Sequence, residues 1–549
     1  MAENVHASTQ PPASDRGAVL DEAHLGDIEG AFGTIRAGDI ASRRSLGARL
    51  LTLLAIVGPG LIVMVGDNDA GGVATYSQAG QNFGVSLLWT LPLLIPVLVV
   101  NQEMVVRLGA VTGVGHARLI NERFGKFWGA FSVGDLFLLN FPTIVTEFIG
   151  VSLALGYFGV SSYISVPVAA VALVAMTATG SFRRWERFML LFVVANFLVI
   201  PLLVFSHPHL APMVHGFFVP GVKGGVSSTA VLLVIAIVGT TVAPWQLFFQ
   251  QSNIVDKRIT PRYIGYERAD TVIGSLVTVF AATLIVATAA FAFEGTPLAG
   301  KFHNAGSVAR GLEHYLGNGA GAIFAVVLLN ASIIGAAAVT LATSYAFGDV
   351  FGMKHSLHRG FADAKQFYAS FSVLVGLAAG VVLLPHAPLG LITTSVQALA
   401  GVLLPSATVF LLLLCNDKAV LGPWVNTLWL NVLAGLVVAV LVALSLALMA
   451  TTVFPGVAVG ALVDGLGIAL GACVAVAAAV VVRARRAAPE PDTGEPLPRD
   501  TWRMPSLALL ERPRWSRGRR WSMVTMRVYL VIAVLLLLVK AVQLGTGHH

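Results

Sequence analysis

The sequence predicts an all-α membrane protein that crosses the bilayer many times and contains two five-helix repeats of inverted topology. Three observations lead to this fold class. Of the 549 residues, 56% are hydrophobic and only 11% are charged, and the mean hydropathy is +0.80. Thirteen apolar stretches are long enough to cross a hydrocarbon core of about 30 Å. Two of these stretches, five apart in chain order, are interrupted at matching positions.

The composition excludes several classes of protein. Soluble domains carry roughly 25% charged residues, so this chain could not cover a soluble surface. A soluble enzyme and a disordered scaffold are therefore excluded. The net charge of +7 comes from basic residues in short loops, which predicts no nucleic-acid partner. No hydrolase, phosphate-loop or zinc-helix motif is found, so we expect neither an enzyme nor a cofactor.

The apolar stretches divide the chain into six regions. We expect a disordered cytoplasmic tail (1–45), a first inverted repeat (46–206), a second inverted repeat (226–415), additional transmembrane helices (423–482), a basic cytoplasmic linker (483–526) and a last helix (527–545) that either spans the bilayer or lies on its surface. The predicted spans are 50–80, 86–107, 127–157, 163–180, 186–206, 226–255, 269–293, 319–348, 367–384, 389–415, 423–450, 457–482 and 527–545.

Loop charges set the expected orientation. With a cytoplasmic N-terminus, 31 of the 35 Lys and Arg residues fall on the inside and three on the outside, namely Lys223, Lys301 and Arg310. Positive residues concentrate in cytoplasmic loops, so this asymmetry supports the number of spans before residue 483. We expect an integral protein of a bacterial inner membrane, in contact with the lipid bilayer and present as a monomer.

The two interrupted segments predict the position of the functional site. The first is apolar to Val65 and then reads Gly66–Gly72, with sequence GDNDAGG. The sixth is apolar to Val238 and then reads Gly239–Gln246, with sequence GTTVAPWQ. Proline and glycine break helices, and unwound backbone at membrane depth is tolerated only where it is buried or lines a cavity. Two such breaks, one in each repeat, predict a binding site between them.

The residues of the breaks favour a hard cation. Asp67 and Asp69 are carboxylates near the membrane midplane, where charge is costly and usually functional. Unwound carbonyls of Gly66 and Ala243 would add neutral oxygen ligands. The alternative is that either aspartate caps the second half of the first segment. Met64 lies one turn before the break, where packing in the apolar helix is the simpler interpretation.

Other polar residues within the spans extend the prediction. Glu147 shares a helix stripe with Asn140 and Thr143, and is either a pathway acid or a protonated structural glutamate. Gln397 is either an amide ligand or a partner in an interhelical hydrogen bond. Asn330 is a weaker candidate of the same kind.

These residues resemble the natural resistance-associated macrophage protein (NRAMP) family of divalent-metal transporters over roughly residues 50–450. Gly58-Pro59-Gly60 is similar to the family's entry to helix 1. Asp69-Ala70-Gly71-Gly72 stands where the family has Asp-Pro-Gly-Asn, and the run to Gly80 (VATYSQAG) is similar to the family's continuation. This alignment makes Asp69 the counterpart of the family's metal-binding aspartate. Gln397 falls at the position of a helix-10 glutamine.

The departures from the family pattern are as informative as the matches. Ala243-Pro244-Trp245 replaces the family's Met-Pro-His, and Gly72 replaces its ligand asparagine. Thr146–Gly150 is similar to the acidic stretch of helix 3, but the aspartate one turn earlier becomes Ile144. The pattern resembles the NRAMP-related magnesium transporters.

The resemblance implies a leucine-transporter-like fold and transport of Mg²⁺ and also Mn²⁺ as substrates. Loss of the soft methionine ligand disfavours thiophilic ions, and small residues at 72 and 243 predict a wide site for a partly hydrated ion. We expect uncoupled uptake by alternating access. The alternatives are a proton-coupled Mn²⁺/Fe²⁺ transporter and a sodium-coupled amino-acid or organic-solute carrier. The expected metal-binding residues are Asp69, Gly66, Ala243, Gln246 and Gln397, with Asp67, Asn68, Gly72, Thr241, Glu147 and Asn330 in the pathway or behind the ligands.

Overall fold

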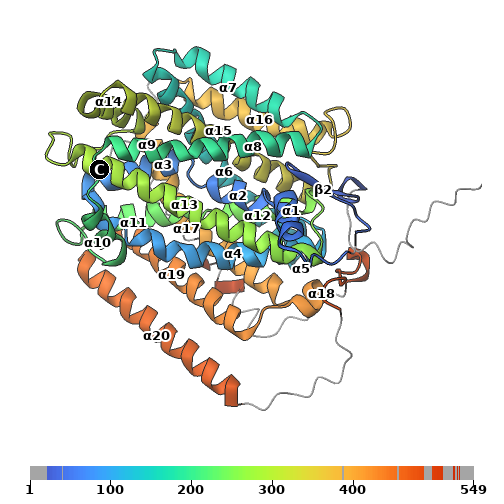
Figure 1. Ribbon diagram of the computed structural model, residues 1–549. Helices are drawn as coiled ribbons and strands as arrows, with labels where there is room; N and C mark the ends of the chain where they lie inside the picture. Colours follow the sequence, from blue (N-terminus) through green and yellow to red (C-terminus); the bar gives the residue numbers. More distant parts are fainter. Residues whose placement is uncertain are drawn as a thin grey trace, which may run out of the picture.

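The computed structural model describes residues 22–39, 41–385, 389–453, 457–486, 498–510 and a few positions between 523 and 531. Within them the chain forms a helical bundle and one short hairpin (Figure 1). The first repeat holds α1 (Leu46–Ile56), α2 (Pro59–Val65), α3 (Ala70–Phe83), α4 (Thr90–Thr112), α5 (His116–Phe124), α6 (Lys126–Tyr157), α7 (Ser162–Thr177), α8 (Phe182–Ala195) and α9 (Val199–Phe205). The connection to the second repeat carries α10 (Leu210–Phe218).

The second repeat and the C-terminal region continue the bundle. They hold α11 (Ser228–Thr241), α12 (Pro244–Asp256), α13 (Ile264–Phe293), α14 (Ala305–Leu316), α15 (Asn318–Phe351), α16 (Lys365–Val382), α17 (Leu389–Cys415), α18 (Lys418–Leu421), α19 (Leu428–Val453) and α20 (Val459–Arg486). Nine helices of the described chain are long and apolar enough to cross a membrane, or eleven if two bent pairs are each one span.

The observed helices match the predicted spans up to residue 482. Each of the twelve segments predicted there coincides with one helix or with two or three consecutive helices. The predicted segment at 527–545 and most of the basic linker at 483–526 lie outside the described residues. Segment one differs from the prediction in having a second bend, of 55°, between α1 and α2.

The packing follows the relation expected between two repeats. The seventh predicted span, α13, packs on α2 and α3 of the first interrupted segment. The second predicted span, α4, packs in the same way on α11 and α12 of the sixth. The third and eighth spans, α6 and α15, pack against each other along their length. These pairings place the two breaks beside each other at the centre of the bundle.

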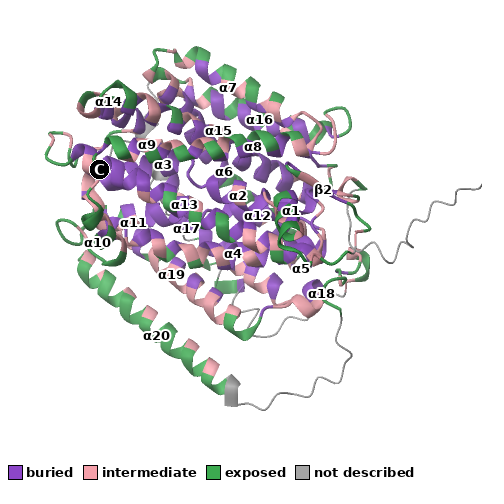
Figure 2. Ribbon diagram, viewed as in Figure 1, coloured by how far each residue is buried: buried purple, intermediate pink, exposed green. Residues whose placement is uncertain are grey.

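Burial separates the bundle interior from its periphery (Figure 2). The interrupted helices α2, α3, α11 and α12 are buried along most of their length. In contrast, α20 is apolar, and none of its most apolar stretch is buried. An apolar helix with so little protein contact is suited to a lipid environment.

The N-terminal tail is partly ordered, which corrects one prediction. Residues 1–45 were expected to be disordered, but Ile28–Gly30 and Gly33–Ile35 form an antiparallel hairpin, β1 and β2. The hairpin lies on α1, where a Cβ added to Gly30 would be only 1.8 Å from the Ala55 carbonyl oxygen. Its tip is held by Glu186 of α8, whose Oε2 accepts from the Ala31 amide at 2.6 Å. These contacts join residues far apart in the sequence, so local composition could not reveal them.

A buried ion pair fixes the bend between α1 and α2. Lys257 Nζ lies 2.6 Å from Glu186 Oε1, and both side chains are fully buried. The same ammonium donates to the carbonyls of Ile56 and Val57 at the bend. Gly58 has φ +152°, and an added Cβ would be 2.1 Å from Glu186 Oε1. Only glycine adopts this backbone conformation without strain and lets the carboxylate approach so closely.

Removing one partner of this pair should destabilise the fold strongly. We expect Lys257→Met to lower the free energy of unfolding by about 3–5 kcal/mol, because Glu186 is left buried without a counter-ion. The measurement is reversible unfolding in mixed micelles, with the exposed Lys301→Met as the control. Lys257→Met combined with Glu186→Gln should recover much of the loss. A double variant as unstable as the sum of its single variants would show that the pair is not coupled.

Candidate metal-binding site between the two broken helices

The first break is four residues long. Helix α2 ends at Val65, and α3 begins at Ala70. Asp69 is the N-cap of α3, and its Oδ1 accepts from the Gly72 amide at 2.6 Å. The break predicted at Gly66–Gly72 is thus confirmed in position, but it ends at Asp69 and not at Gly72. Of the two aspartates, it is Asp69 that takes the capping role left open by the sequence.

The second break is shorter still. Helix α11 ends at Thr241, Val242 lies outside both helices, Ala243 is extended, and α12 begins at Pro244. Proline has no amide hydrogen and suits the first position of a helix, so α12 starts where the sequence requires it to start. The break predicted over Gly239–Gln246 is confirmed at 242–243.

A hydrogen-bonded chain connects the two breaks. Gln246 of α12 donates through Nε2 to Asp67 Oδ1 in the first break and to the Thr241 carbonyl at 3.1 Å. Thr241 Oγ1 lies 2.7 Å from the Tyr76 hydroxyl of α3. Gln102 of α4 donates to Gln246 Oε1 at 3.1 Å. Gln102 was not among the predicted site residues, although an amide inside an apolar span was a signal that could have found it.

Glu147 lies directly beside Asp69. Its Oε2 accepts from the Ala70 amide at 3.1 Å, at the first residue of α3. A Cβ added to Gly335 of α15 would be 2.5 Å from Glu147 Oε2 and 2.8 Å from Asp69 Cβ. Helix α15 therefore closes over both carboxylates at a position that only glycine allows. The structure brings together two acidic residues that are 78 positions apart in the sequence.

Gln397 of α17 lies against the same turn of α3. A Cβ added to Gly71 would be 1.6 Å from Gln397 Nε2 and 3.3 Å from Asp69 Oδ1. The amide is therefore close to the Asp69 carboxylate. Within the described chain, Gln397 Nε2, Asp67 Oδ2 and Thr240 Oγ1 are buried without a hydrogen-bond partner. Buried polar atoms left without a protein partner are positions where a ligand or a water can bind.

Three of the predicted residues have other surroundings. Asn68 points to α13, where its Nδ2 donates to the Thr278 carbonyl at 3.2 Å. Asn330 is buried, and its amide has no hydrogen-bond partner among the described residues. At Gly72, an added Cβ would be 2.7 Å from the Asp67 carbonyl oxygen and 3.2 Å from Thr240 Oγ1. Backbone thus fills the space that a small residue at position 72 was expected to leave open.

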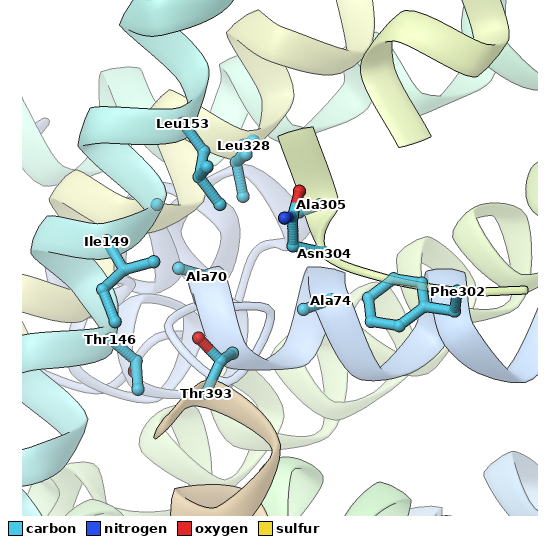
Figure 3. Close-up of a pocket in the computed structure, with 11 residues that line it drawn as sticks. Ala70, Ala74, Thr146, Ile149, Leu153, Phe302, Asn304, Ala305, Leu328 and Thr393 are labelled. Atoms are coloured by element: carbon cyan, nitrogen blue, oxygen red, sulfur yellow. The ribbon is translucent and has the colours of Figure 1, made fainter. Parts of the chain in front are cut away.

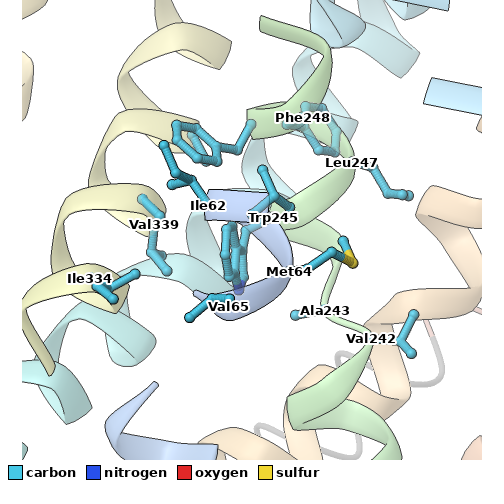
Figure 4. Close-up of a cluster of buried hydrophobic side chains, with 14 of the residues drawn as sticks. Ile62, Met64, Val65, Val242, Ala243, Trp245, Leu247, Phe248, Ile334 and Val339 are labelled. Atoms are coloured by element: carbon cyan, nitrogen blue, oxygen red, sulfur yellow. The ribbon is translucent and has the colours of Figure 1, made fainter. Parts of the chain in front are cut away.

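Trp245 packs on the first break from the other side. A Cβ added to Gly66 would be 3.2 Å from the edge of its ring. Figure 4 shows the indole between Val65 of α2 and the apolar face of α15. Met64 turns its sulfur towards α13, where Ser275 Oγ lies 3.4 Å away. The packing interpretation of Met64 is therefore confirmed.

A small pocket reaches the site from one side (Figure 3). It is lined by residues of α3, α6, the 294–317 connection, α15 and α17, including Ala70, Thr146, Asn304, Leu328 and Thr393. Its volume is about 10 Å³, which is room for roughly one water molecule. The pocket ends at Ala70, next to Asp69, and neither Asp67 nor Asp69 lines it. Both carboxylates are buried in this conformation, with exposed fractions of 0% and 3%.

The chemistry of the site is that of oxygen ligands. No three His, Cys, Asp or Glu side chains of the described residues are grouped in a way that could hold a metal ion. An ion between the breaks would therefore need amide and carbonyl oxygens besides carboxylate. Hard divalent cations accept such mixed oxygen ligands.

Comparison with known proteins supports the same interpretation. The family described as natural resistance-associated macrophage protein-like (Nramp) matches residues 60–451. A divalent metal cation transporter, MntH, of Klebsiella pneumoniae (strain 342) is 28% identical over 406 residues, covering 71% of this chain and 93% of that protein. The MntH of Aeromonas hydrophila is 27% identical over 414 residues, covering 71% and 94%.

A solved structure shares the fold. The manganese transporter of Eremococcus coleocola aligns with a TM-score of 0.60 and 20% identity, over 82% of this chain and 99% of that one. This similarity confirms the predicted fold class, with its two broken helices. Because the match to the Nramp family covers more than half of this chain, the chain belongs to that family.

Proposed function

We propose that this protein transports divalent metal cations across the membrane through the site between its two broken helices. The observation that carries the proposal is the juxtaposition of Asp69, Glu147 and Gln397 at the start of α3, inside a chain of the Nramp family. Relatives in this family are named divalent metal cation transporters. Buried carboxylates at a helix break are suited to binding an ion that must leave water.

We assign Asp69 as the charged ligand. The carbonyls of Gly66 and Ala243 and the amides of Gln246 and Gln397 would supply neutral oxygens. Three features support this set: Gln246 connects the breaks through Asp67, the Gln397 amide lies beside Asp69, and Ala243 is extended in the second break, just before α12. Glu147, behind Asp69, would set the electric field at the bound ion. The ion would replace the Gly72 amide as the partner of the Asp69 carboxylate.

Mg²⁺ is the substrate that this donor set suits best, with Mn²⁺ as a second substrate. No sulfur atom faces the breaks among the residues assigned to the site, since Met64 packs on α13 and position 243 is alanine. Mg²⁺ keeps several waters and is usually bound through one or two carboxylates. The unpartnered atoms of Asp67 and Thr240 are suited to hydrogen bonds with such waters.

Transport driven by the membrane potential alone is sufficient in energy. Moving two charges through 100 mV releases about 4.6 kcal/mol. The positions where the family has a histidine and a helix-3 aspartate hold Trp245 and Ile144, whose side chains do not titrate at physiological pH. Both side chains are buried in apolar surroundings. We therefore propose uncoupled uptake by alternating access, with the N-terminus in the cytoplasm as the loop charges predict.

Proton-coupled transport of Mn²⁺ or Fe²⁺ is the second candidate. One observation favours it: Glu147 lies against Asp69 and could take a proton when a cation binds there. No observation favours a sodium-coupled carrier of amino acids or other organic solutes in this chain of the Nramp family.

Proton movement during uptake separates the two candidates. We expect Mg²⁺ and Mn²⁺ to enter proteoliposomes without acidifying the lumen, because the family's protonatable positions 144 and 245 are apolar here. The measurement follows a metal-sensitive dye and a pH-sensitive dye in the same vesicles, clamped at a negative inside potential. Acidification that depends on the metal, and that is lost in Glu147→Gln, would contradict uncoupled transport and establish the second candidate.

A further inference from the structure

A cavity lies beneath the N-terminal hairpin, away from the two breaks. Its volume is about 360 Å³, which is within the range of small-molecule sites. The walls come from the 22–39 segment, the ends of α4 and α12, the connection between α12 and α13, and residues 500–503. This is the face that the loop charges predict to be cytoplasmic.

The lining of this cavity is rich in guanidinium groups. Arg36, Arg258, Arg262 and Arg503 line it, together with the carboxylates of Asp39 and Asp500. Asp39 is already engaged, because Arg43 Nη2 lies 2.6 Å from its Oδ2 and holds its pKa at about 2. The lining therefore carries an excess of positive charge.

Two of these arginines, Arg36 and Arg503, are available to a ligand. Arg258 donates to the carbonyls of Ala23 and Asp27, which fixes the hairpin segment to the α12–α13 connection. In the described part of the chain, the side chains of Arg36 and Arg503 make no hydrogen bond or ion pair and are exposed. Guanidinium groups bind phosphate in a bidentate fashion, so several around one cavity favour a phosphate-bearing anion.

We propose that this cavity binds a phosphate-bearing anion and that the bound anion holds the cytoplasmic side of the protein closed. The anion would join Arg36, which directly follows the hairpin, to Arg503, whose neighbour Met504 donates its amide to the Val111 carbonyl of α4 at 3.1 Å. The hairpin packs on α1 and is held by Glu186 of α8, so a tighter hairpin keeps α1 against α8. Alternating access requires the half-helices of the first repeat to move relative to the rest, and the anion opposes this movement. The effect on transport, but not the binding, rests on the function proposed above.

Binding is tested first in the absence of any metal. The full chain in detergent, with a chelator present, is titrated with ATP and with adenosine as the phosphate-free control, using calorimetry. The cavity variant combines Arg36→Gln and Arg503→Gln. The matched control combines Arg44→Gln and Arg184→Gln, two exposed arginines that do not line the cavity. We expect ATP to bind, adenosine not to bind, and affinity for ATP to fall about tenfold or more in the cavity variant alone.

A second arm separates a free anion from a lipid headgroup. The same variants are melted in nanodiscs of phosphatidylcholine with or without phosphatidylglycerol. Stabilisation by phosphatidylglycerol that is lost only in the cavity variant, without ATP binding, would assign the phosphate to lipid. If neither source binds, if adenosine binds as well as ATP, or if both variants behave alike, the site does not exist.

The third arm tests the effect on transport. Vesicles are loaded with ATP or left empty, and the rate of Mn²⁺ uptake is compared between the two double variants. ATP inside the vesicles also chelates Mn²⁺. Because this chelation is the same for both double variants, comparing their uptake rates removes its contribution. We expect internal ATP to slow uptake in the control relative to the cavity variant. Equal rates, with binding intact, would overturn the closing effect while leaving the site and the transport function standing.

Discussion

Asp69→Asn is expected to abolish divalent-cation uptake while leaving the protein folded. Asparagine is as good an N-cap as aspartate, so α3 keeps the hydrogen bond that Asp69 accepts from Gly72. Only the negative charge is removed. Losing a residue that supports a metal ligand from behind lowers metal affinity or activity about 10–100-fold. Losing the ligand itself should have a larger effect, so we expect uptake to fall by at least about 100-fold. The measurement is Mg²⁺ and Mn²⁺ uptake into proteoliposomes, with thermal melting to check the fold.

Two further variants make this result specific. Asp69→Ala removes both the charge and the cap. It should therefore lose uptake, and its free energy of unfolding should fall by about 1 kcal/mol. Asp67→Asn keeps an oxygen for Gln246 to donate to, and we expect it to reduce uptake without abolishing it. Normal uptake by Asp69→Asn together with complete loss in Asp67→Asn would show that the two aspartates have the opposite roles.

Ala243→Met is expected to give the site affinity for Cd²⁺. Position 243 is the last residue of the second break and the N-cap of α12, so a side chain there lies at the edge of the site. A thioether is a soft ligand, and soft ligands select soft metals over Mg²⁺. We expect Cd²⁺ to bind at least about tenfold more tightly than to the parent protein, with a smaller change for Mg²⁺. Calorimetric titration of the purified protein with each ion measures this.

Ala243→Leu is the matched control for the sulfur atom. Leucine and methionine have similar volume, so both variants disturb the packing around Trp245 to a similar extent. A gain in Cd²⁺ affinity in both variants would attribute the effect to altered packing. No gain in either variant would show that residue 243 does not face the bound ion.

The parts of the site that the sequence predicts are those with a local cause. Pro244 lacks an amide hydrogen and must begin a helix, and the GDND sequence at Gly66–Asp69 cannot continue one readily. Both breaks are therefore found within a few residues of the prediction. The resemblance of Asp69–Gly80 to the family pattern likewise depends only on the order of residues, and the family it indicated is confirmed over residues 60–451.

The parts that the sequence does not predict depend on distant contacts. The hairpin at 28–35 is held by Glu186, more than 150 residues away, and its own composition resembles a tail. The partner of Gln102 is set by the packing of α4 on α12. The space beside Gly72 is closed by the Asp67 carbonyl, because a backbone without a side chain can move closer to its neighbour. Which aspartate caps α3 also depends on how the turn between α2 and α3 closes.

The most direct test of the account is to locate the ion. Crystals of the protein grown with Mn²⁺ should show an anomalous difference peak between the two breaks, in contact with the Asp69 carboxylate and close to the Ala243 carbonyl and Gln397. The same peak should be absent in Asp69→Asn. An ion bound elsewhere in the bundle, or one that contacts Asp67 while Asp69 still caps α3, would contradict the central claim.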